Sequence, residues 1–314
     1  MNIIRLNELK FLSLDKKDLS LEEEEQVLEF IKLLNSSENV HILYRGENTN
    51  LLKNKYNEED IFKIARYIFN IGEKADHLIK YSIPKNEYET LISEFQKLID
   101  KLKENKYNEY FLDQDIKNFQ NIIDDIDESN FINYKKLFFY YYSLLHNKDR
   151  QVDSIVISTS CSRSIAEKAV TNNGKFKSGN ILYLFAPNRL LKNGYIIKQT
   201  KINELKKLDS FISRLIKDKD YPRIIKYEYN EDEFFIFKVI FPHFIFGTEL
   251  LEEKVFIPNP EIFKISGFES VLENGFPLDQ SKFGEYIKET SFKRYMDTYD
   301  FDVFRGNDVD KNQN

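Results

Sequence analysis

Residues 154–172 read SIVISTSCSRSIAEKAVTN and lie where the character of the chain changes. The β-branched run Ile155–Ser158 predicts a short strand, and the Ser and Thr residues behind it are typical of a strand end and of a helix cap. A helix is expected over Ser164–Asn172. Upstream of this stretch the pattern is mainly helical, and downstream of it strands predominate.

The flanking sequence supplies the other expected elements. Upstream, one short strand is expected at Val40–Tyr44, among helices at Leu21–Leu34, Asn57–Ile71, Pro84–Glu104, Leu112–Ile126 and Phe131–Leu145. Downstream, a helix is expected at Ile202–Lys217. Short β-branched and aromatic runs predict further strands at Ile181–Ala186, Gly194–Gln199, Arg223–Tyr229, Glu233–Phe241, Lys254–Ile257 and Ile262–Ser266.

Strands in series with few helices indicate an α+β fold with an antiparallel or mixed sheet. We expect one domain over 1–305, helix-rich in 1–150 and strand-rich in 151–305, because the lone strand at Val40 needs a sheet to join. The tail 306–314 is expected to be frayed.

Composition narrows the class of protein. The 314 residues include 46 Lys+Arg and 52 Asp+Glu, for a net charge of −6, and 41% are hydrophobic. With 10 Gly, 7 Pro and 1 Cys, the chain is not collagen-like, of low complexity or a disulfide scaffold. The mildly acidic balance argues against binding nucleic acid through bulk charge.

The expected location is cytoplasmic. The single cysteine, Cys161, cannot form an intramolecular disulfide, so a reducing compartment is the default. Met1–Leu12 has no uninterrupted apolar core and no small-residue cleavage site, so no signal peptide is expected. No apolar run is long enough to span a bilayer. Delivery into a host cytosol without a cleavable signal peptide is the alternative.

Several common catalytic motifs are absent from the sequence. There is no Gly-rich loop of the dinucleotide or Walker type, and Gly-x-Ser-x-Gly does not occur. The four histidines are scattered, without a pair at metal-ligand spacing, so no metal site is expected.

Three short stretches carry the candidate chemistry. Tyr44-Arg45-Gly46 and Ser158-Thr159-Ser160 each lie at an expected strand end, and Glu252-Glu253-Lys254 precede the run Val255–Pro258. Taken singly, each has an ordinary structural explanation: a surface arginine beside a turn, a helix cap, and solvated charges on an edge strand.

In this order, the three stretches resemble the mono-ADP-ribosyltransferase family, in the branch defined by Arg, then Ser-Thr-Ser, then Glu-x-Glu. The similarity covers Val40–Gly46 and Ser154–Gly267, and Val255–Pro258 resembles the strand that follows the family's glutamates. It implies an α+β fold in which a helical layer packs on a split mixed or antiparallel sheet.

The resemblance also implies roles for single residues. An NAD-cleaving transferase has to hold a pyrophosphate and stabilise an oxocarbenium-like state. The first task would belong to the bidentate fork of Arg45, with Gly46 letting the backbone come close to the nicotinamide. Ser158 would hold the catalytic carboxylate, and Thr159 and Ser160 would support the cleft wall.

The glutamates depart from the family's pattern, because Lys254 occupies the position of the catalytic carboxylate. A β-bulge would put Glu253 in the catalytic place, and a register slip by two residues would put Glu252 there. The remaining interpretation is a degenerate site that binds NAD or a partner without turnover.

The expected function is transfer of ADP-ribose from NAD, used as a substrate, to a macromolecular acceptor with release of nicotinamide. A protein acceptor, modified at an arginine, is favoured over a nucleic acid. A toxin, effector or defence role with a neutralising partner protein fits the family, and no metal or membrane is expected to take part. The alternatives are a non-catalytic binding protein on the same scaffold and an NAD glycohydrolase. Phe241–Thr248 is interpreted either as an acceptor-recognition loop or as core residues at a strand end.

Overall fold

The computed structural model describes residues 6, 8–74, 87–104, 117, 120–121, 123–127, 130–146, 156–171, 178–192, 195–198, 233–237, 239–264 and 272. The expected helix at Ile202–Lys217, the expected strand at Arg223–Tyr229 and the tail 306–314 lie outside these residues. So does most of the helix expected at Leu112–Ile126.

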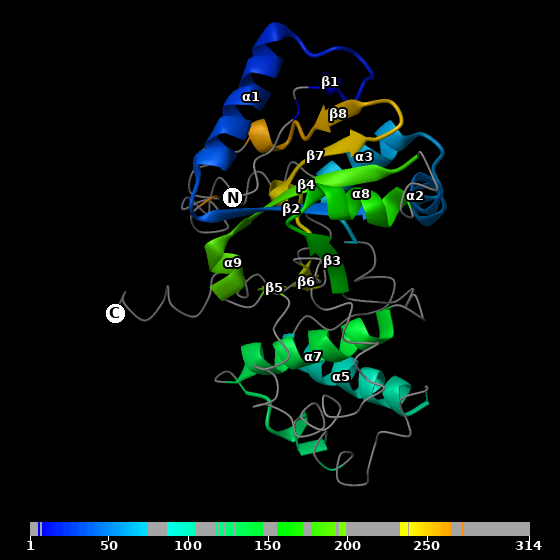
Figure 1. Ribbon diagram of the computed structural model, residues 1–314, viewed down its shortest axis with the longest axis vertical. Helices are drawn as coiled ribbons and strands as arrows, with labels where there is room; N and C mark the ends of the chain where they lie inside the picture. The colour runs from blue at the N-terminus through cyan, green and yellow to red at the C-terminus, as the bar shows by residue number, and fades with distance from the viewer. Residues whose placement is uncertain are drawn as a thin grey trace.

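The described strands form one eight-stranded sheet in the order β1-β8-β7-β4-β2-β3-β6-β5 (Figure 1). Neighbouring strands are antiparallel, apart from the parallel pair β1 and β8, so the sheet is mixed and the fold is α+β. The strands are β1 Lys10–Phe11, β2 Val40–Glu47, β3 Val156–Ser160, β4 Asn180–Pro187, β5 Ile196–Lys198, β6 Glu233–Phe237, β7 Ile245–Leu250 and β8 Val255–Pro258.

Helices surround this sheet, and several begin at side-chain caps. Helix α1 starts at a capping box in which Ser20 and Glu23 satisfy each other's backbone N–H groups. Asn48 and Asp60 cap α2 and α3 in the same general way. The described helices are α1 Leu21–Ser36, α2 Thr49–Tyr56, α3 Ile61–Ile71, α5 Glu87–Glu104, α7 Phe131–His146, α8 Arg163–Thr171 and α9 Asn188–Lys192.

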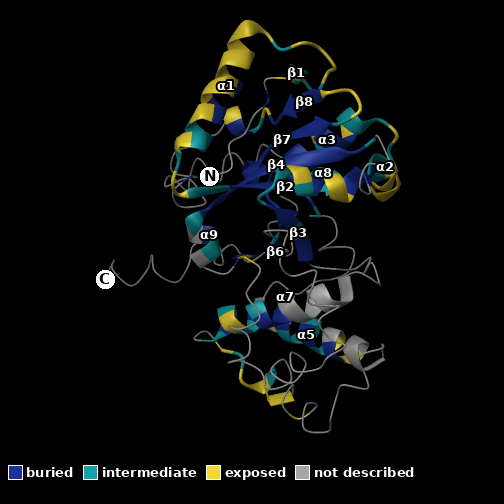
Figure 2. Ribbon diagram, viewed as in Figure 1, coloured by how far each residue is buried: buried dark blue, intermediate teal, exposed yellow. Residues whose placement is uncertain are grey.

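The central strands are covered on both faces. Every residue of β4 and of β7 is buried, as Figure 2 shows for the middle of the molecule, whereas α1 turns an exposed face outward. Such continuous burial is typical of strands that are packed on both sides. Phe30 of α1 contacts Phe185 of β4 and Phe246 of β7 with ring centroids 6.1 and 5.3 Å apart, so α1 closes one face.

Helices α5 and α7 lie together at the β6 end of the sheet (Figure 1). The ring of Phe139 in α7 stacks on Phe235 of β6 with centroids 5.0 Å apart, and Phe138 contacts Phe95 of α5. Two helices from the first half of the chain are therefore packed on a strand from the second half.

The sheet opens between β2 and β3. Strand β2 pairs with β4 from Val40 to Glu47, but its register with β3 contains the single pair Tyr44↔Ser160. Beyond that pair, β2 and β3 separate toward Glu47 and Val156. The opening divides the sheet into a larger part ending at β2 and a smaller part formed by β3, β6 and β5.

Several expected elements differ from those observed. The strand predicted at Ile262–Ser266 is wrong, because Ile262–Lys264 forms a 3-10 turn that follows Asn259, whose amide oxygen accepts from the backbone N–H of Glu261 at 3.0 Å. The stretch Phe241–Thr248 is buried in a short 3-10 helix, η2 Pro242–Phe244, and in β7, which agrees with the core interpretation. Helix α2 was not expected; it ends at Asn57, which takes a left-handed conformation with φ 49°, so α3 begins later than predicted.

Candidate functional site

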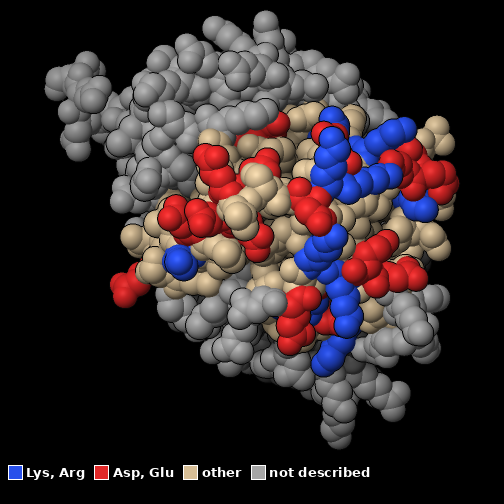
Figure 3. All heavy atoms as spheres, turned by 90° about the horizontal axis from the view of Figure 1, so that it is seen from above, with Lys and Arg blue, Asp and Glu red and all other residues tan. Residues whose placement is uncertain are grey.

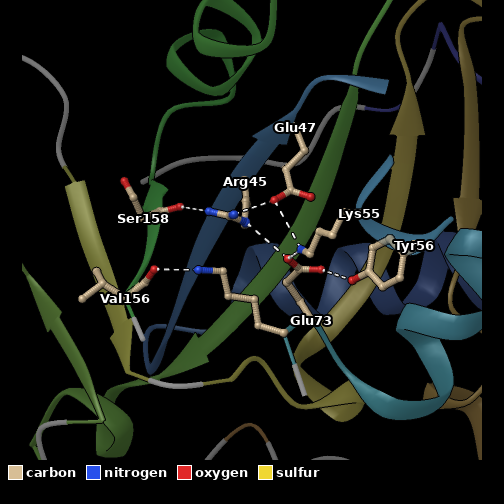
Figure 4. A network of polar contacts seen from close by, with 8 residues as sticks. Arg45, Glu47, Lys55, Tyr56, Glu73, Val156 and Ser158 are labelled. Atoms are coloured by element: carbon tan, nitrogen blue, oxygen red, sulfur yellow. Dashed lines mark hydrogen bonds and ion pairs between the residues drawn. The ribbon is translucent and has the colours of Figure 1, made fainter. Parts of the chain in front are cut away.

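Arg45 lies at the opening between β2 and β3 and reaches across it. Its Nη1 donates to the backbone carbonyl of Ser158 at 3.0 Å, and its side chain is 15% exposed (Figure 4). Because β2 and β3 are no longer paired here, the guanidinium takes a carbonyl that a neighbouring strand would otherwise satisfy. The structure thus brings together two of the residues singled out from the sequence.

The hydroxyl of Ser158 makes a second contact, in the opposite direction along the sheet. It donates to the carboxylate of Glu233, the first residue of β6, which lies opposite Ser160 in the antiparallel register. Arg45, Ser158 and Glu233 therefore occupy three adjacent strands, with Ser158 touching the other two. All three side chains are partly accessible.

Glu233 was missed as a site residue, although the sequence contains a signal for it. Glu231-Asp232-Glu233 has the Glu-x-Glu spacing and directly precedes the aromatic run Phe234–Phe237. It also follows Ser-Thr-Ser in chain order, as the family's pattern requires. Glu231 itself lies outside the described residues.

Glu252 and Glu253 do not join this cluster. They are exposed in the turn between β7 and β8, next to Lys254, which has a left-handed backbone with φ 54°. Strands β7, β4 and β2 separate β8 from β3 in the sheet. The expected hydrogen bond between Ser158 and either glutamate is therefore absent, and Glu233 accepts that bond instead.

The other two residues of Ser-Thr-Ser make local hydrogen bonds. Thr159 Oγ1 donates to the carbonyl of Phe234 at 2.9 Å and ties β3 to β6. Ser160 Oγ accepts from the backbone N–H of Ser162 at 3.1 Å, in the turn that leads into α8. Both residues hold the strand end that carries Ser158.

Gly46 has a packing role different from the one implied by the resemblance. A Cβ added to it would overlap the carbonyl oxygen of Ala166 and the side chain of Val170 in α8. Glycine at this position lets α8 lie directly against β2, so its presence is explained without an approaching nicotinamide.

A buried group of charges surrounds the guanidinium of Arg45. Nη2 pairs with Glu47 at 2.5 Å, and Nε lies 4.0 Å from the carboxylate of Glu73, which has no exposed side-chain surface. Lys55 also pairs with Glu73, and Tyr56 donates to it at 2.8 Å. Figure 4 shows these side chains converging from β2, α2 and the segment after α3.

For Glu73 and Arg45, the neighbouring opposite charges together shift the pKa further than burial does. Burial alone would raise the pKa of Glu73, but the neighbouring cations Lys55 and Arg45 lower it to about 2. Burial would lower the pKa of Arg45, but Glu47 and Glu73 raise it. Arg45 Nε is buried without a hydrogen-bond partner and faces the Glu73 carboxylate at 4.0 Å.

The segment after α3 carries Glu73 into place through an unusual backbone. Gly72 has φ 93°, and a Cβ there would overlap the carbonyl oxygen of Ile240. The backbone of Glu73 exchanges hydrogen bonds with Ile240 at 2.9 and 3.1 Å, and Lys74 follows with φ 65°. A helix ended by glycine is visible in the sequence, but nothing local indicates that the next residue meets Arg45.

A second polar cluster fixes α8 to the sheet. Arg163 donates through Nε to Glu249 at 2.8 Å, and Tyr183 also donates to Glu249, at 2.6 Å. Glu249 is 2% exposed, and burial raises the pKa of Tyr183. Because α8 follows Ser-Thr-Ser immediately, this cluster stabilises the helix next to Ser158.

The comparisons with known proteins give no relative. The chain matches no protein-family model, and neither a curated protein nor a solved structure matches it. Among the described residues, no helix is long and apolar enough to cross a membrane. The described residues also contain no group of three or more His, Cys, Asp or Glu side chains placed to hold a metal ion.

Proposed function

We propose that the chain is an NAD-dependent ADP-ribosyltransferase that moves ADP-ribose to a macromolecular acceptor and releases nicotinamide. The observation that carries the proposal is the contact of Arg45, Ser158 and Glu233 across three adjacent strands at the opening of the sheet. In this proposal the catalytic carboxylate is that of Glu233, and not that of Glu252 or Glu253.

The residues at the opening fit the phosphate-bearing part of NAD. Arg45 uses one N–H of each terminal nitrogen for Ser158 and Glu47, which leaves the second N–H of each terminal nitrogen. The remaining donors of a planar guanidinium suit the oxygens of a diphosphate. Glu47 and Glu73 keep this group charged, and the ion pairs keep it in place.

Glu233 supplies the negative charge that the reaction needs. When the bond between nicotinamide and ribose C1′ breaks, the nicotinamide nitrogen keeps the electron pair and positive charge develops on the ribose. A carboxylate beside the ribose stabilises that charge. The hydrogen bond from Ser158 orients the carboxylate. A nucleophile of the acceptor then bonds to C1′ and loses its proton.

Two features favour a protein acceptor modified at arginine. Glu231 precedes Glu233 by two residues, the spacing at which the family places a glutamate that positions the acceptor. On the face shown in Figure 3, acidic side chains lie beside the basic ones, and nucleic-acid binders instead gather basic residues on one surface.

The proposal is tested by label transfer. The purified chain is incubated with NAD biotinylated on the adenine and with an arginine-rich protein, and the label on protein is measured. We expect labelling by the wild type and at least about a tenfold loss in Arg45→Lys, which keeps the charge but lacks the bidentate fork. Arg66→Lys is the control, because Arg66 is exposed and pairs with Asp15 away from the opening.

Each other outcome has a defined meaning. Nicotinamide release without labelled protein would replace the transferase with an NAD glycohydrolase. If the chain releases no nicotinamide and labels no protein, although a range of proteins is present, the proposal is contradicted.

A further inference from the structure

Lys74 and Arg45 both donate hydrogen bonds to β3, at carbonyls two residues apart. Its Nζ donates to the carbonyl of Val156 at 3.2 Å, whereas Arg45 donates to the carbonyl of Ser158 at 3.0 Å. Carbonyls two residues apart on a strand point to the same side. Two cationic groups from different parts of the chain therefore line one edge of the opening in the sheet.

The backbone places Lys74 there at some cost. Lys74 has φ 65°, a conformation that a side chain with a Cβ rarely adopts, and it follows Gly72 at φ 93°. The hydrogen bonds between Glu73 and Ile240 hold this corner against the sheet. Residues kept in such conformations gather at ligand-binding sites, where the surrounding structure enforces them.

Burial and two neighbouring cations disfavour the protonated form of Lys74. Arg45 and Glu47 face it from β2, Lys55 faces it from α2, and Glu73 precedes it. Burial, Arg45 and Lys55 lower the pKa of Lys74 to about 7, since Glu73 and Glu47 compensate only in part. Among the other described groups nearby, Tyr56 donates to Glu73, and Glu233 accepts from Ser158. An incoming anion would relieve the repulsion among the cations.

We propose that Lys74 is a second binding residue for the diphosphate of the dinucleotide, acting together with Arg45. The identity of the dinucleotide as NAD rests on the proposed function. The binding chemistry itself requires only a ligand with adjacent phosphates, for which one planar guanidinium and one compact ammonium are complementary.

If Lys74 binds the diphosphate, the affinity for the diphosphate should fall as the pH rises. Anion binding favours protonated Lys74, so affinity is fully present below about pH 7 and is lost as the pH rises above that value. The loss is limited to tenfold per pH unit, because one proton is involved.

The test is calorimetry of ADP-ribose and of ADP at pH 6.0 and 8.5, with four forms of the protein. Wild type is expected to bind about tenfold more weakly at pH 8.5. Lys74→Met should bind about tenfold more weakly at pH 6.0 and show little pH dependence. Lys74→Arg should bind tightly at both pH values, because its charge persists. Lys63→Met, on the exposed surface of α3, should behave as wild type.

A stability measurement separates this role from a structural one. The lowered pKa means that the folded state disfavours charged Lys74, so Lys74→Met should melt at or above the wild-type temperature at pH 6.0. The difference should shrink as the pH rises from about 7 to 10.5, because only above 10.5 is the lysine neutral in both states. A variant that is weaker in binding but not in stability has lost a ligand contact.

The outcomes also separate this inference from the proposed function. Lys74-dependent binding of ADP, with adenosine binding unaffected by the substitution, supports the diphosphate site even if no nicotinamide is released from NAD. Wild-type affinity in Lys74→Met at pH 6.0 overturns it, even if the transferase is active. The inference is also overturned if the wild type binds neither ADP nor ADP-ribose.

Discussion

At the scale of single residues, Glu73 is the most deeply buried carboxylate of the charged group around Arg45. Its side chain is fully buried, whereas that of Glu47 is 15% exposed, and it contacts Lys55, Tyr56 and Arg45. Removing one member of a buried ionic group leaves the others without compensation, which is more costly than never having buried them.

Glu73→Gln should therefore destabilise the fold by about 3 kcal/mol at pH 7. It should also weaken NAD binding, because Arg45 loses an anion that orients it. Urea unfolding measures the first effect and calorimetry the second. Glu59→Gln is the control, since Glu59 is 89% exposed and pairs only with Lys53 in the described structure. Equal urea midpoints for Glu73→Gln and Glu59→Gln would contradict the role given to Glu73.

The lowered pKa of Glu73 predicts that the unfolding free energy falls at acid pH. Its pKa is about 2 in the folded state against a reference value of 4.5, so its contribution is present above pH 4.5 and is lost as the pH falls toward 2. The difference in unfolding free energy between wild type and Glu73→Gln should shrink across that interval. A difference that stays constant from pH 5 to pH 3 would argue against the ionised form.

At the scale of elements, α8 joins the strand that carries Ser158 to the core. Its link to β4 and β7 is made by Arg163, Tyr183 and the buried Glu249.

Arg163→Met leaves the carboxylate of Glu249 without its cation, so a loss of about 3 kcal/mol in unfolding free energy is expected. Thermal unfolding should show a clear drop in Tm, whereas Lys168→Met, exposed on the same helix, should leave Tm nearly unchanged. A drop of the same size in both variants would mean that the Arg163 cluster is not the link.

Local pattern predicted most of the described elements. The strands at Val40–Tyr44, Ile155–Ser158 and Ile181–Ala186 were identified because β-branched and aromatic runs are bounded by polar residues. Helix α2 and strand β7 were missed for different reasons. The eight residues of α2 have a weak apolar pattern, and Pro242 and His243 interrupt the run that ends in β7.

At the scale of the whole molecule, the site depends on strand order, which no local pattern contains. Val255–Pro258 was correctly expected to be a strand, but it pairs with β7 and β1 at the far side of the sheet. Glu233 begins the strand next to Ser158 because β6 pairs with β3 along its whole length. Arg45 and Ser158 were found from the sequence, whereas Glu73 and Lys74 depend on a corner that packs against Ile240.

In the proposed reaction, the carboxylate held by Ser158 stabilises the positive charge that develops on the ribose. The most direct measurement is nicotinamide release from NAD by Glu233→Gln, compared with wild type and with the double variant Glu252→Gln/Glu253→Gln. We predict at least about a hundredfold loss in Glu233→Gln, because the substitution removes the charge that stabilises the oxocarbenium-like state. The double variant should keep wild-type activity, since both residues lie exposed in the turn between β7 and β8. Release that persists in Glu233→Gln and disappears in the double variant would contradict the catalytic role proposed for Glu233.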